Sequence, residues 1–206
     1  MQGTGPRKWV PAAAGAIVVA ALVAALLIFA GKDDQPVAAA HTTAPPATSV
    51  ARTTADPGTT PGVVVLPAGG TAKLVAEQVG ADGTLPIPQS LGEAAWWGAG
   101  LGADHGVTLF SGHVNWHGQT GPFDQLWQIK QGQTVSVTDT AGAKWTYRVD
   151  EVRTIPKGSL AGESQQLFSP GGPHKLVLVT CGGDYVGGSE GYDDNRVVTA
   201  SLTARP

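Results

Sequence analysis

The sequence predicts an all-β domain, a barrel or a sandwich with a few short helices, preceded by one membrane-spanning helix and a disordered stalk. Five short runs rich in β-branched and aromatic residues follow one another between turn residues, which favours strands over helices. The 29 glycines and 15 prolines exceed ordinary usage and also argue against a mainly helical body. A chain of 206 residues has room for one ordinary globular domain and appendages.

The membrane-spanning helix is expected over residues 11–30 (PAAAGAIVVAALVAALLIFA), which carry no charge. At about 1.5 Å per residue, a helix of this length spans about 30 Å, the hydrocarbon thickness of a bilayer. Arg7 and Lys8 lie in residues 1–10, so the positive-inside tendency leaves this N-terminus in the cytoplasm. A cleaved signal peptide is the alternative, because residues 37–40 (VAAA) are small, but the apolar region of such peptides is usually shorter. We therefore expect a single-pass protein of the cell membrane with its domain on the extracellular face.

The stalk is predicted over residues 31–69. Up to about Pro61 this segment is rich in Ala, Thr and Pro and has no aromatic residue, so it cannot bury enough apolar surface to offset the entropy lost on ordering. A stalk of this kind would hold the domain away from the lipid, near targets in the surrounding wall. The folded domain is expected over residues 70–206.

Strands are expected at the five β-rich runs, which are residues 106–114, 134–139, 145–152, 175–181 and 196–202. In the second run Val135 and Val137 alternate with polar neighbours, as in a strand with one buried face. The fourth run (KLVLVTC) is almost continuously apolar, which is typical of a central strand covered on both faces. Cys181 therefore ends a buried strand.

Charge and cysteine content narrow the function. A net charge of -3 provides no basic field for phosphates, so nucleic acid is not expected as a partner. The single cysteine cannot form an intramolecular disulfide, and an unpaired thiol in an exported chain indicates a potentially reactive group. The alternative is an inert, buried thiol.

Three residues are candidates for acyl-transfer chemistry. Cys181 stands at the mouth of a core strand, and Gly182 and Gly183 follow it and let backbone or substrate approach the sulfur. His113, at the end of an earlier strand, is the candidate to exchange a proton with the thiol. Arg196, which opens the next strand, is the candidate donor to the oxyanion of a tetrahedral intermediate. Taken singly, each has a structural alternative: a buried thiol, a turn histidine and a solvated charge.

Two segments resemble the motifs of a known family. Residues 176–183 (LVLVTCGG) resemble the strand-ending TLxTC motif of sortases, and residues 111–115 (SGHVN) resemble the motif around their catalytic histidine. The likeness extends over about residues 70–202, through the segments DGTLPIP, GPFDQL, QGQTVSVTD and YDDNRVVTA. Together with the predicted anchor and stalk, the chain is similar to actinobacterial class F sortases, with class E as the next subgroup.

This resemblance implies the eight-stranded sortase β-barrel and a cysteine transpeptidase. Such an enzyme cleaves an LPXTG-like sorting signal of a surface protein after threonine and holds the acyl group as a thioester on Cys181. It then passes the acyl group to an amine of a peptidoglycan precursor or to a protein lysine. His113 would protonate the leaving amine, and Arg196 would steady substrate and oxyanion. No cofactor and no metal are implied. The implied partners are sorting-signal peptides, the amine acceptor and, through residues 11–30, the membrane.

One position departs from the family pattern. The family arginine usually stands five residues before the alanine of the last strand's motif, and counting back from Ala200 reaches Asn195. Because neighbouring residues of a strand point to opposite faces, Arg196 would then turn away from Cys181 unless a bulge intervenes, and Asn195 would be the donor. A catalytically inactive, membrane-tethered module that binds wall peptides is the alternative function, and it depends on this altered register.

Other assignments are weaker. A zinc site from His113, His117 and Cys181 would need the two histidines on a helix, whereas the glycines that follow His117 indicate a strand running into a loop. The pair Trp96 and Trp97 is expected to pack at the core or rim rather than bind carbohydrate. A structural wall-spanning protein would show repeats or longer apolar patches that this sequence lacks.

Overall fold

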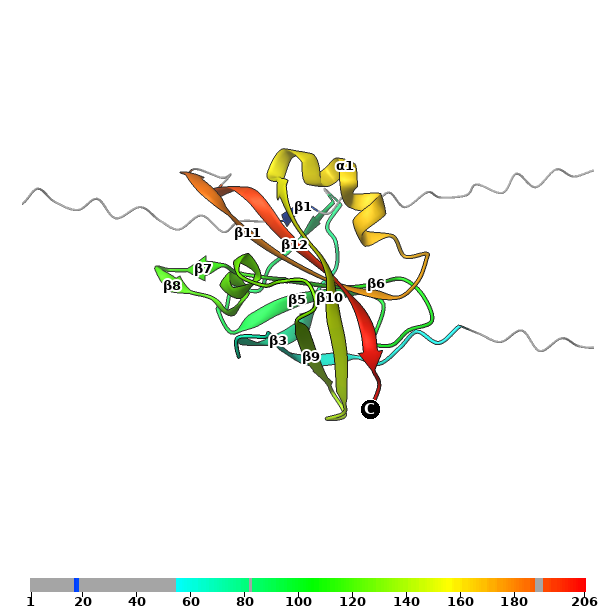
Figure 1. Ribbon diagram of the computed structural model, residues 1–206. Coiled ribbons are helices and arrows are strands. Elements are labelled where there is room, and N and C mark those ends of the chain that lie inside the picture. Colours follow the sequence, from blue (N-terminus) through cyan, green and yellow to red (C-terminus); the bar gives the residue numbers. More distant parts are fainter. Residues whose placement is uncertain (1–16, 19–54, 82, 188–190) are drawn as a thin grey trace, which may run out of the picture.

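The computed structural model describes residues 17–18, 55–81, 83–187 and 191–206, and its centre is a closed β-barrel (Figure 1). Eight strands form the barrel in the order β10, β12, β11, β6, β5, β3, β2 and β9, and β9 pairs again with β10. Their bounds are β2 Pro61–Val65, β3 Thr71–Ala76, β5 Glu93–Gly98, β6 Val107–Gly112, β9 Thr134–Asp139, β10 Lys144–Pro156, β11 Lys175–Gly187 and β12 Gly191–Ala204. The predicted all-β class and the eight-stranded barrel are confirmed.

The other elements are short strands and helices that are not part of the barrel. The remaining elements are the strand pairs β1 Ile17–Val18 with β4 Thr84–Leu85 and β7 Asn115–Trp116 with β8 Gln119–Thr120, the 3-10 helix η1 Pro122–Trp127 and the α-helix α1 Lys157–Phe168. Each of the five runs predicted as strands lies within, or overlaps, one barrel strand. The sequence placed no helix at α1.

Two neighbouring pairs of barrel strands run parallel, β3 with β5 and β6 with β11. The other neighbours run antiparallel. Strands β6 and β11 run in the same direction, and their pairing ends at Ser111 and Val179, so the loop that follows β6 lies beside the middle of β11. This pairing, joining segments far apart in the sequence, creates the candidate site.

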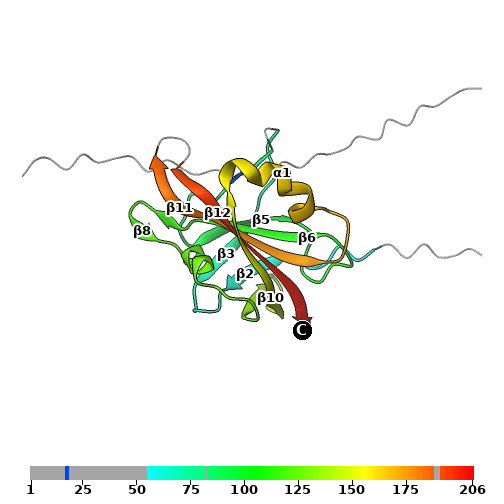
Figure 2. The same cartoon turned by 45° about the horizontal axis from the view of Figure 1, so that its top comes forward.

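The alternating faces of the strands fill two apolar clusters. One lies inside the barrel and includes Phe110, Leu178 and Val198. The second lies on the other face of the same strands, where Val177 and Val179 pack with residues of α1. Figures 1 and 2 show α1 lying across this side of the barrel, near β11 and β12. The segment Leu176–Val179 is fully buried, which confirms that this strand is covered on both faces.

Helix α1 owes its position to packing rather than to local helix signals. It follows β10 directly, and its N-cap, Pro156, makes no side-chain hydrogen bond to the first turn. Leu160, Leu167 and Phe168 are buried and recur at the spacing of one helix face. Because these side chains cover the second apolar cluster, the helix closes that side of the barrel.

The barrel begins earlier than the predicted domain boundary at residue 70. Strand β2 pairs with β3 and β9, and its Val64 is fully buried in the barrel interior. Within the part of the chain that the structure describes, no helix has the length and apolar character needed to cross a bilayer. Apart from β1, residues 11–30 lie outside the described residues, as does the stalk up to residue 54, and both stay predictions.

Candidate active site

Cys181 and His113 come together at one edge of the barrel. Val179 of β11 is paired with Ser111 of β6. Two residues further along the chain from each lie Cys181, still in β11, and His113, directly after β6. Both side chains are 7% exposed. They line the same cavity of about 60 Å³, together with Lys157 at the start of α1. The structure therefore places the two predicted residues in one pocket.

This pocket is narrow and partly closed by two polar side chains. Its volume of about 60 Å³ is far below the roughly 300–1,000 Å³ of ordinary small-molecule sites. The Asn115 amide donates a hydrogen bond to the Tyr192 hydroxyl, and both residues line the pocket. They also line a wider depression of about 410 Å³, which reaches Gly182 and Gly183. Asn115 and Tyr192 thus line both the thiol pocket and the wider depression beside it.

A backbone carbonyl sets the orientation of the His113 ring. Nε2 lies 2.9 Å from the carbonyl oxygen of Pro88, which can only accept, so Nε2 carries the hydrogen. In the neutral ring Nδ1 is then free to accept a proton. Burial lowers the pKa of His113, and the hydrogen bond to Pro88 opposes this effect in part. The ring is neutral at rest and suited to act as a base.

The thiol is also neutral at rest. Burial raises the pKa of Cys181, and the positive charge of Lys157 opposes this increase. A buried thiol opposite a neutral imidazole can become a nucleophile by giving its proton to the ring. The pocket therefore holds an acid and a base that are both uncharged before reaction.

Arg196 does not line this pocket. Strand β12 pairs Arg196 with Thr180 and Asn195 with Cys181, and no bulge interrupts this part of the register. Directly paired residues share a face, so Arg196 lies on the face opposite to Cys181. Its Nε donates to the Leu126 carbonyl oxygen at 3.1 Å, and its guanidinium lies 5.4 Å from the centroid of the Trp127 ring. The structure brings Cys181 and His113 together and leaves Arg196 outside the pair.

Asn195 is the polar residue beside Cys181 on the shared face. It is fully buried, and neither its amide nitrogen nor its amide oxygen has a hydrogen-bond partner among the described residues. An unsatisfied buried polar group costs about 1–3 kcal/mol, so its presence calls for an explanation, of which a catalytic role is one. Asn195 therefore offers a donor without a partner next to the nucleophile candidate.

Trp127 holds the backbone at Cys181. Its indole Nε1 donates to the Cys181 carbonyl oxygen at 3.1 Å. A Cβ on Gly182 would overlap the same indole, so only glycine leaves room for it. The sequence correctly indicated a close approach at this glycine, but the approaching group is a tryptophan of η1.

Sequence reasoning missed Pro88, Lys157 and Trp127. They lie on a loop, a helix start and a 3-10 helix far apart in the chain, and no local motif links them to the cysteine.

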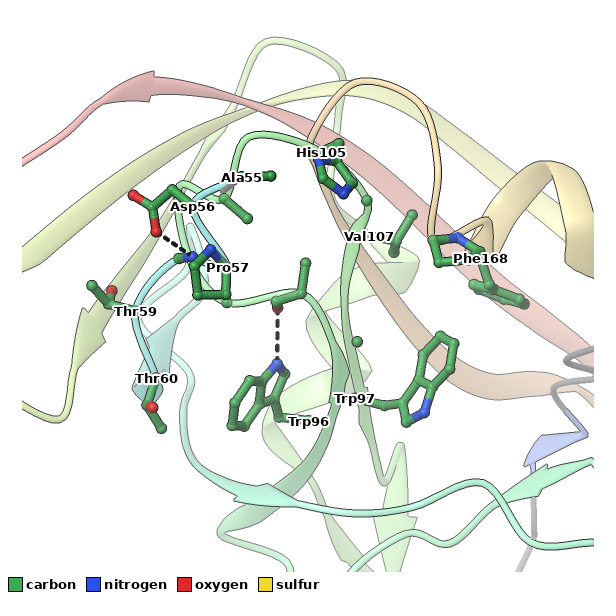
Figure 3. A pocket seen from close by; sticks show the side chains of 17 residues that line it. Ala55, Asp56, Pro57, Thr59, Thr60, Trp96, Trp97, His105, Val107 and Phe168 are labelled. Atoms are coloured by element: carbon green, nitrogen blue, oxygen red, sulfur yellow. Dashed lines mark hydrogen bonds between the residues drawn. The ribbon is translucent and has the colours of Figure 1, made fainter. Parts of the chain in front are cut away.

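A larger cavity of about 570 Å³ lies near the opposite end of β6 and includes Trp96, Trp97 and Val107 (Figure 3). Trp96 donates to the Ala99 carbonyl oxygen at 3.2 Å, and both tryptophans pack against the buried clusters, as expected.

The described residues contain no group of three or more His, Cys, Asp or Glu side chains that could hold a metal ion. The zinc alternative through His113, His117 and Cys181 therefore finds no support in the geometry of these residues. The pocket chemistry is instead that of a thiol, an imidazole, an ammonium group and two phenols.

Comparison with known proteins identifies this architecture. The family model of the Sortase domain matches residues 65–203. The SrtA sortase from Actinomyces oris is 20% identical, with a TM-score of 0.50 over 72% of this chain and 86% of that one. Sortase C1 from Streptococcus agalactiae (19% identity, TM-score 0.53, 70% and 68% covered) and Listeria monocytogenes sortase A (16%, 0.51, 71% and 88%) are also similar in fold. No curated protein sequence matches. Because the family model covers well over half of its length, this chain belongs to the sortase family.

Proposed function

We propose that this sortase is a cysteine transpeptidase that cleaves an LPXTG-like sorting signal after threonine and transfers the acyl group to an amine. The observation that carries the proposal is the meeting of Cys181 and His113 in one pocket, Cys181 from the middle of β11 and His113 from the position directly after the parallel strand β6. A thiol beside an imidazole with a free Nδ1 is the arrangement that acyl transfer through a thioester requires.

In the proposed reaction His113 carries the thiol proton to the leaving amine and later carries a proton of the incoming amine to the sulfur. Nδ1 of His113 takes the proton of Cys181, and the sulfur attacks the threonine carbonyl carbon. The bond from this carbon to the glycine nitrogen breaks as His113 returns the proton to that nitrogen, which leaves a thioester. An incoming amine then attacks the thioester carbon and gives a proton to His113, and the proton returns to the departing sulfur.

The tetrahedral intermediates place negative charge on the former carbonyl oxygen, which needs a donor. We assign this role to the Asn195 amide, since it shares the face of Cys181 and has no other partner among the described residues. Arg196, the donor expected from the family, instead supports Trp127 from the opposite face.

The setting of the reaction is also part of the proposal. Residues 11–30 would anchor the chain in the cell membrane and the stalk would present the barrel on the extracellular face, which is where sorting signals and wall precursors meet. The class F assignment and the choice between a peptidoglycan amine and a protein lysine as acceptor belong to this proposal.

The test incubates the full-length chain with a fluorogenic LPXTG peptide and an amine acceptor, and follows products and the acyl-enzyme by intact mass spectrometry. We expect cleavage and transfer by the wild type and loss of both in Cys181→Ala and His113→Ala. Asn195→Ala should lose at least about tenfold in kcat/KM, the usual scale for one oxyanion donor being 10²–10³. Arg196→Ala serves as the control on the opposite face and should lose less.

Peptide binding without any thioester would instead support the membrane-tethered binding module. A loss in Arg196→Ala that exceeds the loss in Asn195→Ala would return the donor role to the arginine.

A further inference from the structure

The pocket of Cys181 receives its positive charge from a residue that neither the motifs nor the family pattern indicates. Arg196, the expected cation, lies on the other face of β12. We propose that the ammonium group of Lys157 is the cation of this pocket and stabilises the thiolate form of Cys181. The inference rests on the proposed function only in taking Cys181 as the nucleophile.

The fold places Lys157 beside the cysteine through three adjacent strands. Ile155, near the end of β10, pairs with Asn195 of β12, which pairs in turn with Cys181 of β11. Strand β10 ends at Pro156, and Lys157 follows as the first residue of α1. Its side chain lines the same small cavity as Cys181 and His113.

Among the residues that line this pocket, Lys157 carries the positive charge. His113 faces the pocket from the loop after β6 and is kept neutral by its lowered pKa, while Tyr185 of β11 and Tyr192 of β12 contribute phenols. The carboxylates of Asp193 and Asp194 lie beside Gly183, two residues beyond the cysteine, and neither residue lines the pocket. Burial disfavours the thiolate, and the positive charge of Lys157 offsets this effect in part.

The start of α1 carries no acidic group that would oppose the charge of Lys157. Its first turn contains no acidic residue and its N-cap has no side-chain hydrogen bond, so the positive end of the helix dipole is not neutralised locally. The charge of Lys157 is the influence that lowers the pKa of Cys181 against its burial. Lys157 acts through the sulfur rather than on the substrate, and its removal should reduce the fraction of reactive thiolate at every pH below the thiol pKa.

The test measures this fraction without any sorting peptide. The full-length chain is alkylated with iodoacetamide, a neutral reagent, from pH 6 to 10, and the single cysteine is followed by intact mass. Lys157→Gln should slow alkylation about 3- to 10-fold at pH 7 and move the pH profile upward by about half a unit to one unit, since one pKa unit changes the thiolate fraction tenfold. Lys157→Arg should keep the wild-type profile. Lys144→Gln, at an exposed position at the start of β10, removes the same charge elsewhere and should change nothing.

Two outcomes would overturn the inference. One is a Lys157→Gln profile that superimposes on that of the wild type. The other is an equal loss in Lys157→Arg, which would show that packing rather than charge matters. If Lys157→Gln does not fold, Lys157→Met keeps the length of the side chain and serves instead. A shifted alkylation profile in a chain that never forms a thioester would refute the proposed function and leave the role of Lys157 intact.

Discussion

Replacing Gly182 by alanine is the sharpest test of how the cysteine strand is held. The backbone of Gly182 does not adopt a left-handed conformation, so alanine can take its φ without strain. The added Cβ would nevertheless lie closer than 3.0 Å to three atoms of the Trp127 indole. The indole must therefore move, and it carries the hydrogen bond to the Cys181 carbonyl oxygen.

The expected cost combines two contributions. Overpacking of a well-filled site costs about 1–3 kcal/mol, and loss of one hydrogen bond about 0.5–1.5 kcal/mol. We expect Gly182→Ala to lower the free energy of unfolding by about 2–4 kcal/mol. The measurement is urea unfolding of the full-length chain, followed by the fluorescence of its six tryptophans.

Two matched variants isolate the cause. Gly162→Ala, in α1, meets no atom within 4 Å and should gain up to about 1 kcal/mol, because alanine favours helix. In a Trp127→Leu background the smaller side chain leaves room, so Gly182→Ala should cost less than half of its value in the wild type. An equal cost in both backgrounds would refute the contact with Trp127 as its origin.

Three further predictions follow from the pocket. Tyr192→Phe removes the hydrogen bond from Asn115 and should raise the rate of Cys181 alkylation a fewfold, measured with iodoacetamide at fixed pH; an unchanged rate would mean that this contact does not limit access. Arg196→Gln should lower the free energy of unfolding by about 1–2 kcal/mol, because its contacts to η1 are lost. The rate of Cys181 alkylation should stay within twofold of the wild type, because the guanidinium is on the opposite face. A larger change in this rate would contradict that placement. Because burial lowers the pKa of His113, the unfolded chain binds a proton at this histidine more readily than the folded chain does. The contribution to stability is therefore full above the usual histidine pKa of 6.5 and declines as the pH falls below it. His113→Asn should remove part of this decline in the free energy of unfolding, measured by urea titration at pH 7 and pH 5, and an unchanged decline would exclude the contribution of His113.

Local patterns predicted much of the fold. The alternating pattern of β9 indicates one buried face, and the continuous apolar run of β11 indicates two. Both patterns can be recognised from consecutive residues alone. The same patterns put Cys181 at the end of a strand, but only the buried part of β11 ends near it and the strand itself continues to Gly187; His113, expected at the end of another strand, directly follows β6. The motif count also raised Asn195 as an alternative to Arg196, since side chains alternate strictly along a strand.

Other features have no signal within a few residues. The Ala, Thr and Pro composition around β2 predicted a stalk rather than a strand. This segment forms a strand because it pairs with β3 and β9, which also buries Val64. Helix α1 contains Gly158 and Gly162, has no side-chain cap and begins directly after a strand, so its sequence alone did not indicate a helix. Its apolar residues become a helix face only when they cover the outer cluster of the barrel.

The sequence by itself determined the all-β class, the nucleophile candidate and its histidine, because these depend on period, burial and motif. The tertiary structure decided what surrounds the thiol. It set the parallel pairing of β6 and β11, the face on which Arg196 lies and the approach of Lys157. These features depend on contacts between residues far apart in the chain, whose pairing is chosen by the packing of the whole barrel and not by any local preference.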